Sequence, residues 1–240
     1  MDLAEALCAT DGICCFVGAG GKKTTMYTLA RHADRAVVTA TVRIPPFDAH
    51  VADVCVTTDP AAAIAQTSDW PLGVVPAREG PDRYRGYEPE TLAGLVDTVA
   101  DVILVKADGA RMRKFKAPAE HEPQIPHTAR IVVPIVSAHV IGRPLEETLV
   151  HRVDRVSSIT GMQPGDELTP QAVAEVLASP SGGQQGVPEG ATVVPLINMV
   201  DSEALRRRAE SVASLIHEKA DVPRVVLARM IDPDPLVAVR

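Results

Sequence analysis

The stretch 13-ICCFVGAGGKKTTMY-27 decides how this chain is expected to fold. Residues 13–17 form an unbroken apolar run of strand length, and three glycines separate it from KKTT at the start of an expected helix. Glycines let backbone N–H groups approach an anion without Cβ clashes, and a helix N-terminus adds free donors and the positive end of its dipole. A lysine adds charge, and a threonine hydroxyl can ligate Mg²⁺. The stretch therefore predicts a nucleotide phosphate loop, with these cofactor-binding residues: Gly18, Ala19, Gly20, Gly21, Lys22, Lys23, Thr24 and Thr25.

The spacing of this loop departs from the usual phosphate-loop pattern. That pattern places four residues between its first glycine and its GK[ST] end, whereas Gly18 and Gly21 have two residues between them. Lys22 directly follows the last glycine, and Lys23 precedes a hydroxyl, so both are candidates for the catalytic lysine. We favour Lys22. The alternative interpretation is a glycine-rich turn between strand and helix with a solvated lysine pair.

Composition limits the class of protein. A chain of 240 residues that is 46% hydrophobic can bury a substantial core, and we expect a single domain over residues 1–240. The net charge of −7 and an aromatic content of 3% argue against a nucleic-acid binder, which needs broad positive charge and stacking platforms. The four cysteines show no CxxC spacing, and no apolar run approaches the roughly 20 residues that span a bilayer. With no pattern of a signal peptide at its start, we expect a cytoplasmic protein that binds no membrane.

Apolar runs alternate with helical patterns along the chain. This order predicts an α/β fold with a mostly parallel, doubly wound sheet, similar to that of P-loop NTPases. The apolar spacing of Leu145, Leu149, Val153 and Val156 predicts one helical face, and hence a helical insertion at about 142–180. Strands are expected at 13–17, 36–41, 54–57, 72–76, 101–106, 131–136, 191–197 and at an edge within 222–230; helices are expected at 2–8, 24–33, 60–66, 89–100 and 203–220.

Polar residues follow several of the expected strands. Thr39 and Thr41 end the second strand at the carboxyl edge, where open α/β sheets bind their ligands, and they are predicted to contact substrate. Asp108 follows the apolar run 101–106, in the place where phosphate-loop proteins hold Mg²⁺ or its water. Thr24 and Asp108 are therefore the predicted metal ligands, and Asp108 is also a predicted catalytic residue. The alternative is an Asp-Gly turn at residues 108–109.

The segment 111-RMRKFKAPAEHEPQIP-126 is rich in charge. Its prolines forbid long regular structure. Its cations could clamp an anionic substrate, and its Glu-His-Glu run could serve acid–base chemistry or hold a metal, with His121 as a candidate catalytic residue and general base. The alternative is a solvated charged face. The predicted substrate-binding residues of this segment are Arg111, Arg113, Lys116, Glu120, His121 and Glu122.

Asn198 and Asp201 follow the last strong apolar run, at 191–197. They resemble the NKxD element of GTPases, in which the aspartate accepts the guanine N–H donors, although Met199 stands in the place of the lysine. Both are predicted nucleotide contacts. An equally open alternative is that Asp201 or Ser202 caps the helix expected from residue 203.

Five stretches together resemble the YqeC family, which is described as accessory proteins of selenium-dependent molybdenum hydroxylases. The stretches are VGAGGKKTT at 17–25, ADGAR at 107–111, KAPAEHEP at 116–123, GRPLEE at 142–147 and NxxD at 198–201. The resemblance implies a P-loop-like protein linked to maturation of a selenium- and molybdenum-containing cofactor, with the glycine loop, Asp108 and the NxxD pair in the roles given above. The chain departs from the expected pattern at Lys106, where an acidic residue is expected, and at Met199, where a lysine is expected.

Three functions are compatible with these features. The favoured one is an enzyme that binds Mg²⁺ with ATP or GTP, an NTPase or phosphotransferase that supports maturation of a molybdenum hydroxylase, whose pterin cofactor or protein would be a partner. The second is a non-catalytic module whose glycine loop holds a phosphate of that cofactor. The third is a small-molecule kinase with residues 78–85 as a lid.

Overall fold

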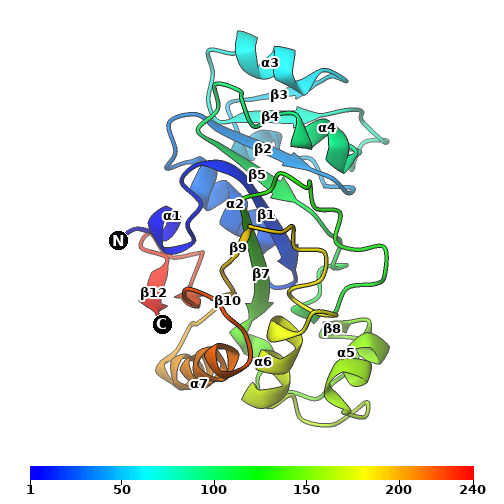
Figure 1. Ribbon diagram of the computed structural model, residues 1–240, viewed down its shortest axis with the longest axis vertical. Helices are drawn as coiled ribbons and strands as arrows, with labels where there is room; N and C mark the ends of the chain where they lie inside the picture. Colours follow the sequence, from blue (N-terminus) through cyan, green and yellow to red (C-terminus); the bar gives the residue numbers. More distant parts are fainter.

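A computed structural model describes residues 1–240 as an α/β structure around one extended sheet (Figure 1). The sheet has 10 strands in the order β12-β11-β10-β7-β1-β5-β2-β4-β3, with β9 beside β7. All pairings are parallel except β11 with β12. The mostly parallel α/β sheet is thus confirmed, and the likeness to P-loop NTPases stays a prediction. The strands are β1 Gly12–Gly18, β2 Ala36–Ala40, β3 Asp53–Val56, β4 Leu72–Val75, β5 Val102–Lys106, β7 Ile131–Ser137, β9 Thr192–Val193, β10 Leu196–Asn198, β11 Val226–Ala228 and β12 Leu236–Val239.

Strand β1 lies in the middle of the sheet and is buried on both faces. Cys14 and Phe16 pack with α2 in one core cluster, whereas Ile13, Cys15 and Val17 belong to another cluster on the opposite face. This explains the unbroken apolar run, because a central parallel strand meets packed helices on both sides. The cysteines of β1 are accordingly core thiols.

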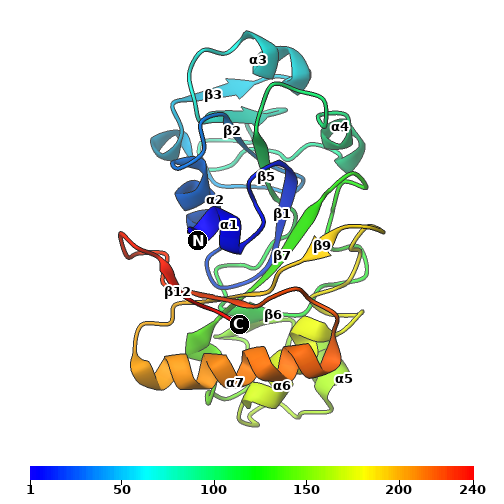
Figure 2. The same cartoon turned by 60° about the vertical axis from the view of Figure 1, so that its left-hand side comes forward.

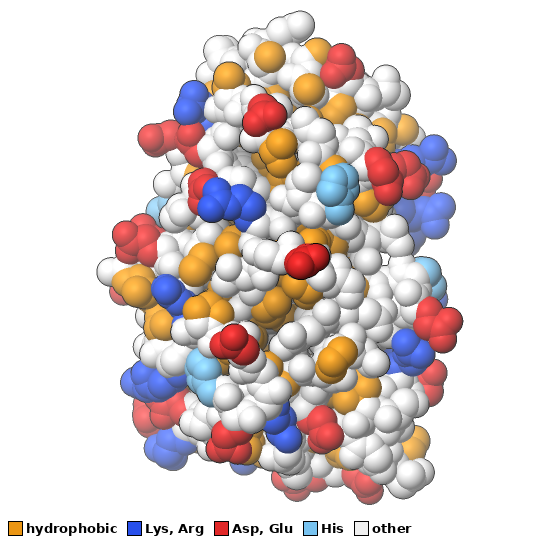
Figure 3. Space-filling model, viewed as in Figure 1, with side chains coloured by type: hydrophobic (Ala, Val, Ile, Leu, Met, Phe, Trp, Pro, Cys, Tyr) orange, Lys and Arg blue, Asp and Glu red, His pale blue; other side chains and the backbone are white.

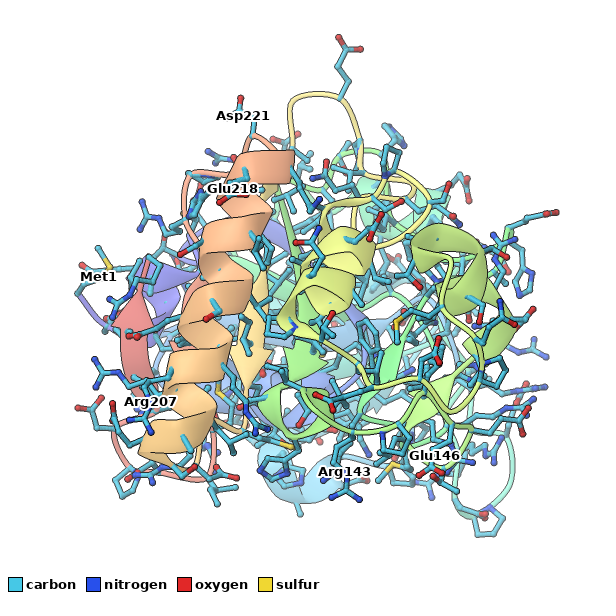
Figure 4. The ribbon with its side chains drawn as sticks, turned by 90° about the horizontal axis from the view of Figure 1, so that it is seen from below. Met1, Arg143, Glu146, Arg207, Glu218 and Asp221 are labelled. Atoms are coloured by element: carbon cyan, nitrogen blue, oxygen red, sulfur yellow. The ribbon has the colours of Figure 1, made fainter.

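Seven α-helices cover the sheet, and none of them combines the length and the hydrophobicity needed to cross a membrane. Helices α6 and α7 pack against each other at the lower end in Figures 1 and 2. Figure 4 shows α7 running across this end from Arg207 to Glu218, side by side with α6. The α-helices are α1 Leu3–Ala6, α2 Lys22–Ala30, α3 Pro60–Gln66, α4 Pro89–Ala93, α5 Val153–Thr160, α6 Pro170–Ala178 and α7 Glu203–Lys219; the 3₁₀ turns are η1 Asp48–His50 and η2 Ala138–Val140.

The prediction of a helix that begins near Leu145 is wrong. Residues 150–151 instead form strand β8 (Val150–His151), which pairs with β6 (Phe115–Lys116) in a separate two-stranded sheet. Arg152 then adopts a left-handed conformation with φ of 64°, and α5 begins only after it. Leu145 and Val150 are buried in the same cluster as Val156. The apolar spacing therefore predicted correctly which side chains are buried. The buried positions before residue 153, however, belong to a strand and a turn, and the helix begins only after them.

Candidate functional site

The glycine loop crosses the carboxyl ends of β7 and β10. Gly18, Gly20 and Gly21 have φ values of +84°, +106° and +127°. A Cβ atom on Gly18 would lie 2.4 Å from the carbonyl oxygen of Ile135, and one on Gly20 would lie 2.4 Å from the amide nitrogen of Ser137. Both the backbone conformation and the packing therefore exclude side chains here.

Asn198 holds this loop on the sheet. Its Nδ2 donates to the carbonyl oxygen of Gly20 at 2.8 Å, and its Oδ1 accepts from the amide of Met230 at 3.3 Å. Both polar ends of the buried Asn198 amide are thus engaged by backbone. We conclude that Asn198 fixes the position of the loop.

The N-terminus of α2 presents free amide groups. The first backbone hydrogen bond of its opening turn runs from the amide of Thr25 to the carbonyl oxygen of Gly21, at 3.0 Å. The amides of the five preceding residues, Gly20 to Thr24, donate to no acceptor within the chain, and no side chain caps the helix. Successive free N–H groups at a helix N-terminus attract anions, because their partial positive charges and the helix dipole add. This group of five residues, 20–24, is called the amide nest below.

Asp108 lies beneath the glycine loop. Its Oδ2 accepts from the Gly18 amide at 2.9 Å and lies 2.9 Å from Lys116 Nζ, and its Oδ1 lies 2.8 Å from Lys22 Nζ without a well-directed hydrogen bond. Lys22 Nζ also donates to the carbonyl oxygen of Gly18. Burial opposes ionisation of Asp108, but the charges of Lys22 and Lys116 outweigh it and hold the pKa below its ordinary value. The carboxylate is therefore a buried anion between two ammonium groups.

Lys116 connects Asp108 to a second carboxylate. Its Nζ lies 2.7 Å from Glu122 Oε2 and donates to the carbonyl oxygen of Gly109 at 2.6 Å. Arg152 Nη1 approaches the same Glu122 oxygen at 2.6 Å. The charge run of residues 111–122 is thus partly a buried network, formed where β6 pairs with β8.

A third buried lysine, Lys106, ends β5 near this network. Its Nζ donates to the carbonyl oxygen of Arg43 at 2.9 Å. Burial, and then the charge of Lys22, lower the pKa of Lys106 to about 7. Lys22, Lys106 and Lys116 are only 6%, 7% and 4% exposed, so the positive charge of the site is buried. The face in Figure 3, by contrast, shows acidic and basic side chains interspersed.

The remaining polar residues of the loop and of β2 have local partners. Thr24 is exposed at the first turn of α2, and Thr25 Oγ1 donates to the Gly21 carbonyl oxygen at 3.1 Å. Thr39 Oγ1 donates to the Val74 carbonyl oxygen at 2.8 Å, and Thr41 Oγ1 to that of Gln124 at 2.6 Å. The hydroxyls of Thr39 and Thr41 therefore tie neighbouring segments together, and their predicted substrate contacts stay predictions.

Other predicted residues of the charged segment lie at the surface. Arg111 is exposed, and it and Met112 have φ values of +44° and +61°. Glu120 and His121 are exposed as well, and they line an open polar groove. Glu122 borders this groove and the buried network at the same time. Arg113 is half-buried and makes no ion pair with the carboxylates of the network.

A histidine that sequence reasoning missed lies beyond β7. His139 Nε2 is 2.6 Å from Asp201 Oδ2, and His139 Nδ1 is 3.1 Å from Lys114 Nζ. Its signal was its place just past the carboxyl end of an apolar strand. Reading of guanine by Asp201 stays a prediction, and it would require Asp201 to release His139.

The donors around Asp108 do not suit Mg²⁺. This ion requires a near-octahedral shell of oxygen ligands, usually with carboxylates and several waters. Both oxygens of Asp108 face ammonium groups, and no group of three acidic, histidine or cysteine side chains lies close enough to hold a metal ion. A cavity of about 20 Å³ lined by Asp108, Gly18 and Lys116 has room for a single water. With Lys22 as the phosphate lysine, Lys23 stands where the phosphate-loop pattern has a metal-binding hydroxyl. With Lys23 in that role the hydroxyl is that of Thr24, and its predicted contact with a metal stays a prediction.

Comparisons with known proteins connect this geometry to a family. The sequence model of a family described as "YqeC protein" matches residues 14–154, which include the glycine loop, Asp108, Lys116 and Glu122. The "Uncharacterized protein YqeC" of Escherichia coli (strain K12) is 31% identical over 191 residues, covering 76% of this chain and 73% of that protein. No solved structure matches the chain.

Proposed function

This chain belongs to the YqeC family, as its motifs predicted, and we propose that its amide nest binds the phosphates of a nucleoside triphosphate or of another phosphorylated cofactor. The observation that carries the proposal is the run of five amides, Gly20 to Thr24, without an acceptor at the start of α2. Phosphate oxygens are strong acceptors, and amides already oriented by the fold lose little conformational freedom on binding.

Lys22 is the lysine best placed to neutralise a bound phosphate. It is the first residue of α2, and its ammonium group is held against Asp108 and the Gly18 carbonyl oxygen. Asp108 in turn is fixed by the Gly18 amide and by Lys116. Burial lowers the pKa of Lys22, and the charge of Asp108 counteracts this effect. In this proposal Asp108 thereby favours the charged form of Lys22 and orients it under the loop, and Lys23 adds a second positive charge at the nest.

Turnover of the nucleotide, as an NTPase or phosphotransferase, is the enzymatic form of the proposal. Its general base is unassigned. His121 is exposed, whereas His139 is oriented by Asp201 and is the better positioned imidazole. A non-catalytic binding module is the second candidate, and it is favoured by the enclosure of Asp108 between two lysines, which leaves no free carboxylate beside the nest.

The segment at 78–85 is a poor lid for a small-molecule kinase. The backbones of Tyr84 and Ile44 exchange two hydrogen bonds, the Tyr84 hydroxyl donates to Asp48 Oδ1 at 2.9 Å, and Arg43 Nε donates to Glu79 Oε2 at 2.6 Å. Tyr84 itself is fully buried. The segment is thus anchored to the body of the protein, which argues against the kinase alternative.

The wider proposal places this binding step in maturation of the selenium- and molybdenum-containing cofactor of a molybdenum hydroxylase. Its support is family membership together with the motifs at residues 17–25 and 116–123. A strain without this protein is expected to produce hydroxylase of lower activity and lower selenium content, restored by wild type and not by Lys22→Ala. Unchanged selenium content and activity would contradict this cellular role.

Binding itself is tested by thermal stabilisation. The midpoint temperature of unfolding is measured with ATP, GTP and inorganic tripolyphosphate, for wild type, Lys22→Ala and the control Lys219→Ala at the far end of α7. We expect stabilisation of wild type and of the control, and a loss of at least half of the shift in Lys22→Ala. No shift of wild type with any of the three compounds would overturn the proposal. A shift with GTP alone would support base recognition by Asp201.

A further inference from the structure

Positive charge exceeds negative charge by one in the network below the amide nest, in which Lys22 and Lys116 are buried and the Arg152 side chain is 22% exposed. Two carboxylates, those of Asp108 and Glu122, face the cationic groups of Lys22, Lys116 and Arg152. This excess does not include Lys106, which has a carbonyl oxygen and no carboxylate as its partner. The cation that is buried without a carboxylate partner is therefore Lys106, and buried charge without an opposite charge is costly. This observation is independent of the free amides, and it too points to an anionic ligand.

The same network leaves no acidic group free for a divalent cation. Asp108 Oδ2 is shared between the Gly18 amide and Lys116, and Oδ1 faces Lys22. A Mg²⁺ ion at this carboxylate would lie near two ammonium groups, and like charges in a buried site repel strongly. A Mg²⁺ ion at Glu122 would be repelled in the same way, because Lys116 and Arg152 both contact Glu122 Oε2.

Lys23 is a further cation at the amide nest. It lies in the amide nest, directly after Lys22, is half-buried and takes part in none of the ion pairs around Asp108. The phosphate-loop pattern has a metal-ligating hydroxyl at this place. A lysine there offers an ammonium group to phosphate oxygens, with up to three donors and no ligand for a metal.

We propose that the amide nest binds its phosphate ligand as a metal-free anion, with Lys22 and Lys23 in the charge-neutralising place that Mg²⁺ occupies in phosphate-loop proteins. This inference rests on the proposed phosphate binding and narrows it to a ligand class: free tripolyphosphate groups, as in ATP without a metal or in inorganic tripolyphosphate. Magnesium then competes for the ligand, because its complex with ATP carries two fewer negative charges.

The test is a titration of the full chain with ATP and with tripolyphosphate by isothermal calorimetry, once in EDTA and once in excess MgCl₂ at equal ionic strength. We expect a Kd in EDTA that is lower than the Kd in MgCl₂, and an equal Kd in the two buffers would contradict competition by Mg²⁺. Binding that Mg²⁺ tightens tenfold or more would overturn the inference and leave phosphate binding standing. Absence of binding in both buffers would overturn the proposed function, so the two failures are distinguishable.

Three variants assign the effect to Lys23. Lys23→Thr restores the hydroxyl of the pattern, and we expect it to raise the Kd in EDTA about fivefold or more, the effect of one screened unit charge at contact distance. Lys23→Arg keeps the charge and is expected to retain metal-free binding, and Lys219→Thr removes the same charge far from the nest and serves as the control. If Lys23→Thr binds in EDTA as tightly as Lys219→Thr, Lys23 does not replace the metal and the inference fails. Circular dichroism and the unfolding midpoint verify that each variant is folded.

Discussion

Removal of the Asp108 carboxylate is the most informative perturbation of the buried network. In Asp108→Asn the side chain keeps its shape, and its oxygen still accepts from the Gly18 amide, but Lys22 and Lys116 lose their shared anion. Breaking a buried ion pair from one side costs about 3–5 kcal/mol. Because Lys116 keeps Glu122 and the Gly109 carbonyl oxygen, we expect the lower end, about 3 kcal/mol. For a domain of this size that lowers the midpoint temperature by about 6–12 °C.

The assay is urea unfolding followed by circular dichroism, with Asp101→Asn as the matched control. Asp101 precedes the same strand, β5, at its opposite end, and forms an exposed pair with Arg35 at 2.7 Å. Exposed pairs contribute little to stability. A free energy of unfolding that falls equally little in both variants would refute the reasoning, because it would show that the buried lysines do not depend on Asp108.

The pH dependence of this difference has a defined sign. The pKa of Asp108 is lower in the folded chain than its ordinary value of 3.8. The folded state therefore binds fewer protons than the unfolded state in the acid range, and the contribution of Asp108 is complete above about pH 4. It is lost as the pH falls through the lower, folded-state pKa. The difference in stability between wild type and Asp108→Asn should shrink accordingly below pH 4, and a difference that grows there would contradict the charge state assigned to Asp108.

Three further predictions concern the loop and its surroundings. Gly20→Ala places a Cβ against the Ser137 amide at a φ of +106°, so it should destabilise the fold by more than about 1 kcal/mol and abolish tripolyphosphate binding. The control Gly161→Ala also has a positive φ, but it has open space around its Cβ. It should therefore leave binding intact in the same calorimetric titration. Asn198→Ala removes the contacts with Gly20 and Met230 and should cost about 1–3 kcal/mol in urea unfolding, with weaker binding of ATP and GTP alike; a selective loss of GTP would instead indicate base recognition. In wild type the free energy of unfolding should rise between about pH 7 and 10.5, because the folded chain, with Lys106 at a pKa of about 7, binds fewer protons there than the unfolded chain. Lys106→Met should remove this rise. Equal pH profiles of the two proteins would show that the pKa of Lys106 is not lowered by folding.

Local patterns in the sequence predicted the centre of the fold well. The apolar run before the glycines became β1, and the residues after them became α2, because strand length, glycine and helix start are signalled within a few positions. The parallel sheet followed from the alternation of strands and helices. The position of Asp108 beside Gly18 agrees with the general rule that neighbouring parallel strands bring their carboxyl ends together.

Contacts between distant segments were beyond local patterns. Lys116, which contacts both Asp108 and Glu122, belongs to β6, and the strand β8 that pairs with β6 falls in a range that the periodicity assigned to a helix. Arg152 has a left-handed conformation and its guanidinium group lies 2.6 Å from Glu122, and nothing in the residue type signals either feature. His139 escaped notice because its partner Asp201 is 62 residues away in the chain.

Binding of an oxyanion by the five amides from Gly20 to Thr24 is tested by a titration of ¹⁵N-labelled protein with tripolyphosphate, followed by amide chemical shifts in NMR. We expect saturable shifts of these five amides with one common Kd, and slower hydrogen exchange at the same positions in the complex. Saturable binding that leaves these amides unshifted, with the affected residues elsewhere in the chain, would contradict this expectation.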